Sequence, residues 1–389
     1  MTYSPTWTPD SVQQSTVEPI LRRGAVVPPL SDAVQVIEIF HVDEFRTEGG
    51  LTLGSIRLAY ETWGTLNPSG SNAVLILHAL TGDSHATNGN SDEIERGWWQ
   101  ELIGPGRPID TDRYFVLCPN VLGGCRGSTG PSSTAPDGHP YGSRFPLITV
   151  RDQVRAELRL AQMLGIRSWA AVIGGSMGGM RSLEWLCMEP SMVDTAVVLA
   201  VGCSASPEQI ALSSLQMRAI KNDPNYFGGD YQRFGVAPDE GLAIARGLGQ
   251  LSYRGSEELE RRFGRKPQDD RDPRNGGLYA VESYLDHHGK KLAARFDANS
   301  YIVLSQSMNH HDIGRGRGGP KAALAGVKSQ VTVVGISSDR LFPLPQQQNL
   351  ADLLPSRPEV EVVETDIGHD GFLVEYEKVG KIITRSLCS

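Results

Sequence analysis

Cysteine is scarce in this chain, long apolar runs are missing, and basic residues do not outnumber acidic ones. The cysteines are odd in number, and their spacings fit neither a disulfide framework nor a metal-binding knuckle. They are Cys118, Cys125, Cys187, Cys203 and Cys388. We therefore expect reduced thiols, no metal site and a cytoplasmic protein.

No stretch approaches about 18 uninterrupted apolar residues, so we expect no membrane span. The chain has 37 Lys and Arg against 45 Asp and Glu, and this net charge of −8 argues against broad nucleic-acid binding. The polar, proline-bearing start does not have the basic region followed by an apolar region that marks a signal peptide. We interpret residues 1–33 as a flexible N-terminal tail.

Strands are predicted to alternate with helices over much of the chain. The runs 34–42 and 55–64 alternate apolar and polar residues, which predicts an antiparallel pair. Further strands are predicted at 72–80, 114–124, 169–174, 193–202, 331–339 and 360–365, with helices at 151–166, 177–190 and 345–354. This order is typical of the α/β class, with a mostly parallel sheet covered by helices on both faces.

The strand pattern stops after Cys203. Ser206, Pro207 and Gln209 form a strong helix start, with a serine cap, a proline in the first turn and glutamine at the capping-box position. Only helices are predicted before the strands resume, at 207–221, 239–252, 257–264, 279–295 and 299–309. We therefore expect a core formed by 34–203 and 319–389, with an inserted helical lid at 204–318.

The stretch AVIGGSMGG carries the first chemical signal. Gly174-Gly175-Ser176-Met177-Gly178 fits G-x-S-x-G between a predicted strand and a predicted helix, the context of a nucleophile elbow. Small residues are needed two positions before and after the serine because the turn is sharp. Ser176 is therefore the candidate nucleophile.

An elbow serine needs an acid and a base, in the chain order Ser, Asp or Glu, His. Asp339 directly follows a predicted strand, and His369 follows the last predicted strand. Both positions are at carboxyl ends of parallel strands, where this class of fold binds ligands. Asp339 is expected to hold Nδ1–H of His369, and Nε2 of His369 to accept the serine proton.

An oxyanion formed at Ser176 needs hydrogen-bond donors. The Met177 amide is at the positive end of the helix that follows the serine, and a second donor is expected from the loop after the earlier strand at 72–80. We predict that the Leu80 amide is this second donor. His78 precedes the loop, and we interpret it as structural.

Longer motifs resemble the homoserine O-acetyltransferase family, an α/β-hydrolase-fold group of methionine biosynthesis. The resemblance covers about 35–385 and rests on HALTGDSHA (78–86), NVLGGCRGSTGPSS (120–133), GSRFPLITVRDQV (142–154), GGSMGG (174–179), LSYRG (251–255), RFDANSY (295–301), HDIGRGRGG (311–319), SSDRLFP (337–343) and GHDGFL (368–373). It implies ping-pong acetyl transfer from acetyl-CoA, through an acyl-enzyme on Ser176, to the hydroxyl of L-homoserine. No permanently bound cofactor is expected.

The resemblance also implies substrate-binding residues. Arg246 would pair with the carboxylate of homoserine, Asp370 with its ammonium group, and Tyr253 would line the same pocket. The basic run Gly314–Gly319 could meet the phosphates of CoA, although a solvated turn explains it equally well.

The sequence is also compatible with other functions. Related enzymes use succinyl-CoA or acylate serine, and an esterase of the same fold would share the triad and pass the acyl group to water. A non-catalytic member of the fold would be expected to have lost a triad residue. The helical insertion also predicts association into a homodimer.

Overall fold

The computed structural model describes residues 35–38, 45–88 and 96–388. The predicted tail at 1–33 lies outside the described residues. Eight strands form one central sheet in the order β1-β4-β8-β5-β9-β10-β11-β12. Their bounds are β1 (Gln35–Glu38), β4 (Arg57–Trp63), β8 (Phe115–Pro119), β5 (Ala73–Leu77), β9 (Trp169–Gly175), β10 (Val193–Leu199), β11 (Gln330–Ile336) and β12 (Glu361–Val363).

The pairing confirms the expected mostly parallel sheet. β4 pairs antiparallel with both β1 and β8, whereas every pair from β8 through to β12 is parallel. The antiparallel pair predicted between 34–42 and 55–64 is present in the described part as β1 with β4. Parallel strands that share a direction end at one edge, so the loops after β5, β9, β11 and β12 meet there.

The sheet separates two hydrophobic cores. Along β5, Leu75 and Leu77 point into one cluster, whereas Val74 and Ile76 point into the other, because successive strand side chains face opposite ways. Helices α1 (Val150–Met163), α2 (Met177–Met188), α8 (Pro320–Leu324) and α9 (Leu344–Leu353) supply side chains to the first cluster. Helices α10 (Gly371–Val374) and α11 (Tyr376–Cys388) supply the second.

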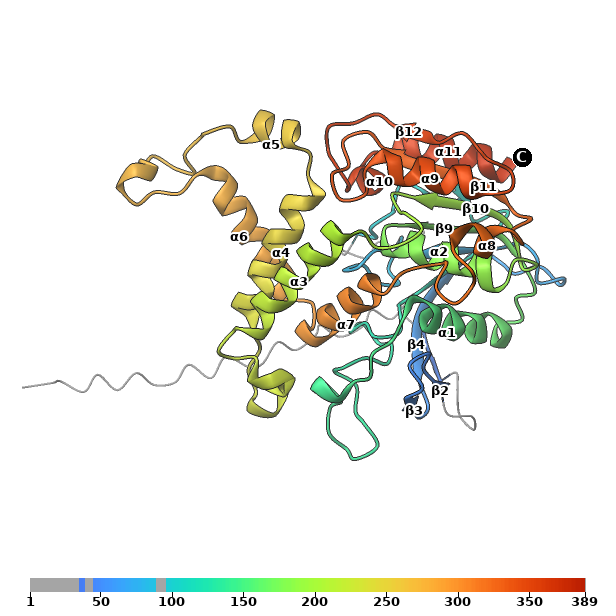
Figure 1. Cartoon of the computed structure of the whole chain (residues 1–389), viewed down its shortest axis with the longest axis horizontal. Helices are drawn as coiled ribbons and strands as arrows, with labels where there is room; N and C mark the ends of the chain where they lie inside the picture. Colours follow the sequence, from blue (N-terminus) through green and yellow to red (C-terminus); the bar gives the residue numbers. More distant parts are fainter. Residues whose placement is uncertain (1–34, 39–44, 89–95, 389) are drawn as a thin grey trace, which may run out of the picture.

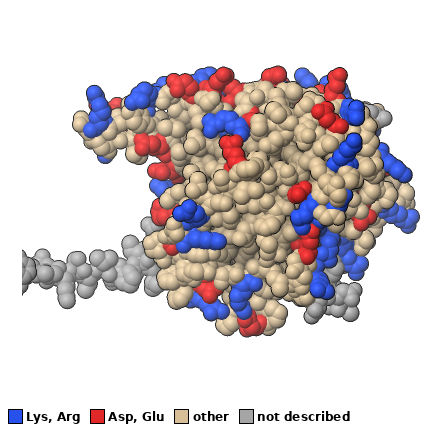
Figure 2. Space-filling model, viewed as in Figure 1, with Lys and Arg blue, Asp and Glu red and all other residues tan. Residues whose placement is uncertain are grey.

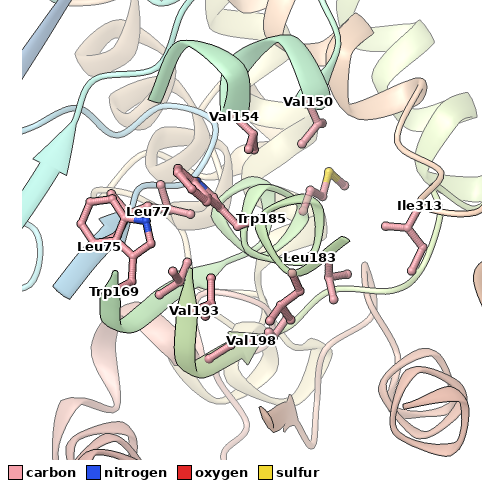
Figure 3. Packing of buried hydrophobic residues seen from close by; sticks show 14 of the residues in the cluster. Leu75, Leu77, Val150, Val154, Trp169, Leu183, Trp185, Val193, Val198 and Ile313 are labelled. Carbon is pink, nitrogen blue, oxygen red and sulfur yellow. The ribbon is translucent and has the colours of Figure 1, made fainter. Parts of the chain in front are cut away.

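Figure 3 shows the first cluster, where side chains of α1 and α2 meet those of the sheet. The rings of Trp169 from β9 and Trp185 from α2 pack edge to face, with centroids 5.7 Å apart. Both tryptophans are fully buried. This packing fixes α2 against the strand that precedes it, and with it the turn between them.

Between β10 and α8 the chain forms a group of helices that lie together beside one end of the sheet (Figure 1). They are α3 (Pro207–Lys221), α4 (Asp239–Tyr253), α5 (Ser256–Arg262), α6 (Ala280–Ala293) and α7 (Ala298–Asn309), with short 3-10 turns η2 (Phe227–Gly229), η3 (Tyr231–Phe234) and η4 (Pro273–Asn275). The predicted capping box of Ser206 and Gln209 starts α3. A third buried cluster joins these helices to Leu80 and Met177, which come from the sheet edge.

Some elements were not predicted from the sequence. The C-terminal helix α11 was missed, although Val379, Ile382, Ile383 and Ser386 are buried with the spacing of one helical face. The others are short: β2 (Phe45–Arg46), β3 (Thr52–Leu53), β6 (Ile103–Gly104), β7 (Ile109–Asp110), η1 (Gly142–Arg144), η2, η3, η4, α8 and α10.

All five cysteines are free thiols. Of the described helices, none is both long and apolar enough to cross a membrane.

Candidate active site

Ser176 occupies a sharp turn between β9 and α2. Its backbone has φ 56° and ψ −123°, a conformation that is costly for a residue with a side chain. The Ser176 amide donates to the carbonyl of Leu199, at 3.0 Å, which holds the turn against β10. A strained serine at the carboxyl edge of a parallel sheet has the geometry expected of a nucleophile elbow.

The glycines around Ser176 each meet a specific neighbour. A Cβ on Gly174 would approach the Gly178 carbonyl carbon to 2.5 Å, and a Cβ on Gly178 would overlap the carbonyl oxygen of Leu77 at the end of β5. Gly175 lies against the ring of Phe372, and Gly179 against Val201. Gly178 therefore lets the first turn of α2 rest on β5.

Asp339 and His369 form a buried hydrogen-bonded pair. Asp339 follows β11 and His369 follows β12, and the distance between His369 Nδ1 and Asp339 Oδ2 is 2.6 Å. The other Asp339 oxygen accepts the amides of Leu341 and Phe342, both at 2.8 Å. Because a carboxylate can only accept, Nδ1 carries the proton, and Nε2 of a neutral ring is left to accept one.

Nε2 of His369 is buried and has no hydrogen-bond partner among the described residues. No direct hydrogen bond joins this nitrogen to Ser176 within this part of the chain. One aromatic ring, however, contacts both His369 and the residue before Ser176. The ring of Phe372 lies 5.5 Å from the His369 ring and also fills the space beside Gly175, the residue before Ser176. Catalytic hydrogen bonds are often long before substrate binds.

Two effects oppose each other on the pKa of His369. Burial disfavours the charged imidazolium and lowers the pKa, whereas the Asp339 carboxylate, through its charge and its hydrogen bond, raises it, with a further contribution from Asp370. The pKa is raised overall. The pair is therefore suited to stabilise a positive charge on the imidazole once it has taken a proton.

The predicted oxyanion donors lie on the two sides of the α2–β5 contact. Met177 is the first residue of α2, where backbone amides have no partner within the helix. Among the described residues, neither the Met177 amide nor the Leu80 amide donates a hydrogen bond. Neither amide is therefore occupied by another part of the described chain, as the predicted oxyanion role requires.

The helical insertion is attached directly to the loop that carries His369. The Gly255 amide donates to the carbonyl of Ile367 at 2.9 Å, and the Asp370 amide donates to the carbonyl of Tyr253 at 3.2 Å. A Cβ on Gly255 would overlap the Asp366 carbonyl. The end of α4 and the histidine loop are thus held in backbone contact.

This contact brings the predicted substrate-binding residues toward the base. The Tyr253 ring lies 5.9 Å from the His369 ring, and the Arg246 guanidinium lies over Tyr253 at 5.5 Å. Arg246 Nη1 is also 3.4 Å from Thr81 Oγ1, in the loop that follows Leu80. Burial raises the pKa of the Tyr253 hydroxyl, with Arg246 lowering it and Asp370 raising it. A cation and an anion therefore both act on one tyrosine hydroxyl.

Sequence reasoning missed the partner of Asp370. Arg254 Nη2 is 3.5 Å from Asp370 Oδ2, and Arg254 Nη1 is 3.8 Å from Glu258. Arg254 lies in the quoted LSYRG motif, next to Tyr253. Its place in this motif is the sequence feature that could have identified it as a residue of the site. It holds the Asp370 carboxylate at the edge of the site.

A small apolar cavity of about 40 Å³ adjoins the site. Leu80, Tyr253 and Phe342 line it, and the Phe342 ring is stacked on His369 at 5.1 Å. The remaining lining residues come mainly from α3 and α7 and include Gln209, Leu212, Gln216, Ser305 and Met308. A larger cavity of about 250 Å³, lined by Tyr231, Pro238 and Arg295, contains no residue of the predicted triad.

The basic run at Gly314–Gly319 is not an isolated positive patch. Arg315 Nη1 pairs with Glu48 at 2.8 Å, and Arg317 Nη2 pairs with Glu184 at 2.7 Å. Arg151 bridges both carboxylates. Arg315 and Arg317 of the run are thus each paired with a carboxylate, although the three arginines outnumber the two acids. The contact with CoA phosphates considered from the sequence stays a prediction. Figure 2 likewise shows acidic and basic side chains interspersed over one face of the molecule.

Comparisons with known proteins agree with this geometry. Residues 72–376 match the family model described as alpha/beta hydrolase fold. The chain is 57% identical over 342 residues to the homoserine O-acetyltransferase of Thermobifida fusca (strain YX), covering 87% of this chain and 90% of that protein. The crystal structure of homoserine O-acetyltransferase from Bacillus anthracis is similar, with a TM-score of 0.84 at 28% identity over 92% of this chain and 98% of that one.

An esterase has nearly the same backbone. The structure of esterase E22 matches with a TM-score of 0.82 at 27% identity, over 91% of this chain and 99% of that one. The backbone alone therefore does not separate acyl transfer to an alcohol from acyl transfer to water.

The contact between α2 and β5 gives a stability prediction. Gly178→Ala places a methyl group against the Leu77 carbonyl, and we expect the free energy of unfolding to fall by about 2–3 kcal/mol. Gly326→Ala is the control, because no atom lies within 4 Å of its added Cβ, and it should change stability by less than about 0.5 kcal/mol. Urea unfolding measures both. Equal midpoints for the two variants would contradict the proposed contact.

The surroundings of His369 give a pH prediction. Neutral His369 is needed to activate Ser176, so the labelling rate of Ser176 by a fluorophosphonate should rise with pH, with a midpoint above the ordinary histidine pKa of 6.5. Asp370→Asn removes a charge that raises this pKa, so its midpoint should move to lower pH. The exposed Asp352→Asn should leave it unchanged. A midpoint unaffected by Asp370→Asn, or labelling that survives Ser176→Ala, would refute the assignment.

Proposed function

The chain belongs to the homoserine O-acetyltransferase family of α/β hydrolases, and on this basis we propose that it transfers the acetyl group of acetyl-CoA to the hydroxyl of L-homoserine, in methionine biosynthesis. The observations that carry the proposal are the buried Asp339–His369 pair, the strained Ser176, and the ring of Phe372, which packs against both His369 and the space beside Gly175. Such a constellation supports acyl transfer through a covalent intermediate.

In the first half-reaction, Ser176 Oγ attacks the thioester carbonyl while His369 Nε2 takes the serine proton. The amides of Leu80 and Met177 stabilise the negative oxygen that forms, and Asp339 stabilises the imidazolium. The carbon–sulfur bond then breaks, and the departing thiolate receives the proton from His369. The products are free CoA and an acetyl ester on Ser176.

In the second half-reaction, the homoserine hydroxyl gives its proton to His369 and attacks the acetyl ester. The same two amides hold the second oxyanion, and Ser176 recovers its proton as the ester bond breaks. Acetyl-CoA is consumed as a substrate and its CoA part leaves after the first half-reaction, so the proposed mechanism uses no permanently bound cofactor.

The acceptor is proposed from charge complementarity. Homoserine carries a carboxylate and an ammonium group. The Arg246 guanidinium lies over the Tyr253 ring, and the Asp370 carboxylate acts on the Tyr253 hydroxyl with the opposite charge. A guanidinium suits a carboxylate, because it offers several donors in one plane. Water has neither charge, so this pair favours an amino-acid acceptor over hydrolysis.

Transfer of a succinyl group, or transfer to serine, is the second candidate. The small, apolar cavity at Leu80, Tyr253 and Phe342 favours a short, uncharged acyl group, since a succinyl carboxylate would need a cationic partner there. We propose residues 204–318 as the helical lid that shields the acyl-enzyme from water, because its α4 end is bonded to the histidine loop. The free thiols and the CoA substrate support a cytoplasmic location.

We also propose a homodimer formed through this lid. Ile244 and Leu251 of α4 are exposed and, with Leu248 and Leu285, line an open groove between α4 and α6. Three charged residues, Glu240, Asp286 and Lys290, also line this groove. Other exposed apolar side chains on the same helical group are Leu215, Phe227 and Phe234. Burying such surfaces against a second copy is a common cause of two-fold association.

If Arg246 binds the acceptor, its substitution should affect the second half-reaction and leave the first unchanged. Arg246→Gln should leave the burst of thiol release from acetyl-CoA intact but raise KM for homoserine by about 10- to 100-fold, because a charge-assisted contact is lost. Arg233→Gln, an exposed arginine of the same helical group, is the matched control. Steady-state thiol release with and without homoserine measures both. Thiol release that homoserine does not accelerate in the unchanged enzyme would refute the proposed function.

The dimer proposal predicts a change in mass. Light scattering should give twice the chain mass for the unchanged protein, and a monomer for Ile244→Lys combined with Leu251→Lys, because charges would enter the interface. Leu51→Lys alters an exposed leucine far from the helical group in sequence and should stay dimeric. A monomeric unchanged protein would exclude the proposal.

A further inference from the structure

His78 is fully buried at the end of β5, and the catalytic steps above do not use it. Its Nδ1 lies 2.8 Å from the carbonyl oxygen of Ala79, the next residue. The Gly82 amide donates to the same oxygen at 3.0 Å, and the His78 ring packs where a Cβ on Gly82 would lie. Two donors from one short loop therefore fix the direction of the Ala79 carbonyl.

The partners of the ring determine its tautomer. A carbonyl can only accept, so Nδ1 of His78 carries the proton. Nε2 lies 3.1 Å from the backbone nitrogen of Val121, whose N–H can only donate, so Nε2 is unprotonated. Burial and the nearby Arg181 also hold the pKa of His78 well below its usual value, which keeps the ring neutral. His78 thus connects the loop after β5 to the loop after β8.

The direction of the Ala79 carbonyl decides where the Leu80 amide points. Ala79 C=O and Leu80 N–H belong to one planar trans peptide, in which the two groups point in opposite directions. Holding the carbonyl toward His78 and Gly82 turns the N–H away from them. Within the described residues this N–H has no acceptor, so it is left for a ligand oxygen.

Arg181 ties the same loop to the helix of the nucleophile. It lies on α2, four residues after Met177, and is fully buried. Its Nη2 donates to the His78 carbonyl at 2.6 Å, and its Nη1 to Glu157 of α1 at 2.7 Å. The other Glu157 oxygen accepts the Trp185 indole N–H at 2.9 Å. The two predicted oxyanion donors are therefore held in one buried framework.

We propose that His78 is a positioning residue for the oxyanion hole, which orients the Leu80 amide through the Ala79 carbonyl, while Arg181 fixes the loop relative to α2. The inference rests on the proposed role of Leu80 in acyl transfer. It assigns His78 a function in both half-reactions without contact with either substrate, since each half-reaction passes through an oxyanion.

The test compares two amide side chains that differ in reach. In His78→Asn the side-chain NH₂ can replace Nδ1 and still donate to Ala79. In His78→Gln the longer side chain reaches toward Val121, the position of Nε2, and leaves the Ala79 carbonyl without its donor. We expect the Gln variant to lose about 100-fold in the rates of both acylation by acetyl-CoA and deacylation by homoserine, with KM for homoserine little changed. The Asn variant should stay within about tenfold of the unchanged enzyme.

A second measurement separates this inference from the proposed function. Ethylboronic acid forms a bond between boron and Ser176 Oγ and places a boronate oxygen where the oxyanion would be, whatever the natural acyl donor is. The inhibition constant of ethylboronic acid is measured by protection of Ser176 from fluorophosphonate labelling. In the Gln variant this constant should rise by about the same factor as the acylation rate falls. In the Asn variant it should stay close to that of the unchanged enzyme. An unchanged enzyme that binds the boronic acid but is not acylated by acetyl-CoA contradicts the proposed function alone, because the boronic-acid comparison still decides the role of His78.

Folding is monitored by the thermal unfolding midpoint of each variant. A purely structural role predicts that the Asn and Gln variants lose stability and activity together. Equal acylation rates and equal boronic-acid affinities in the two folded variants would overturn the proposal.

Discussion

The close approach of helix α2 to the end of strand β5 is the constraint on which the candidate site depends. It exists because Gly178 has no side chain where the carbonyls of Leu77 and His78 pass. The contact sets Ser176 and Met177 on one side and the Leu80 loop on the other. Arg181 adds a buried hydrogen bond across the same contact. The proposed nucleophile and the proposed oxyanion donors are thus positioned by packing within the protein itself.

The helices α3 to α7, between β10 and β11, contribute the other contacts around the candidate active site. The third hydrophobic cluster includes the side chains of Leu80 and Met177, so the two residues proposed as oxyanion donors also pack against the insertion. The end of α4 is bonded through Gly255 to the loop of His369. The guanidinium of Arg246, on this insertion, would therefore keep a fixed position relative to His369 and Asp370, which favours an acceptor that contacts all three.

The sheet and most helices could be predicted, because buried parallel strands are continuous apolar runs and helices show a period of 3.6. Ser176, Asp339 and His369 were found because each follows such a strand, and the structure brings Asp339 and His369 into contact, while their catalytic roles stay predictions. Pairings between distant segments have no local signal. Arg315 with Glu48, and Arg254 with Asp370, depend on the tertiary fold, and so does the orientation of the Ala79–Leu80 peptide.

The central claim is that Ser176 carries the acetyl group between two substrates. Mass spectrometry of the protein after brief exposure to acetyl-CoA alone, followed by peptide mapping, tests it most directly. The account predicts one acetyl group per chain, on Ser176, that disappears when L-homoserine is added and is recovered as O-acetylhomoserine. An unmodified Ser176, or an acetyl group lost to water at the same rate with and without homoserine, would contradict it.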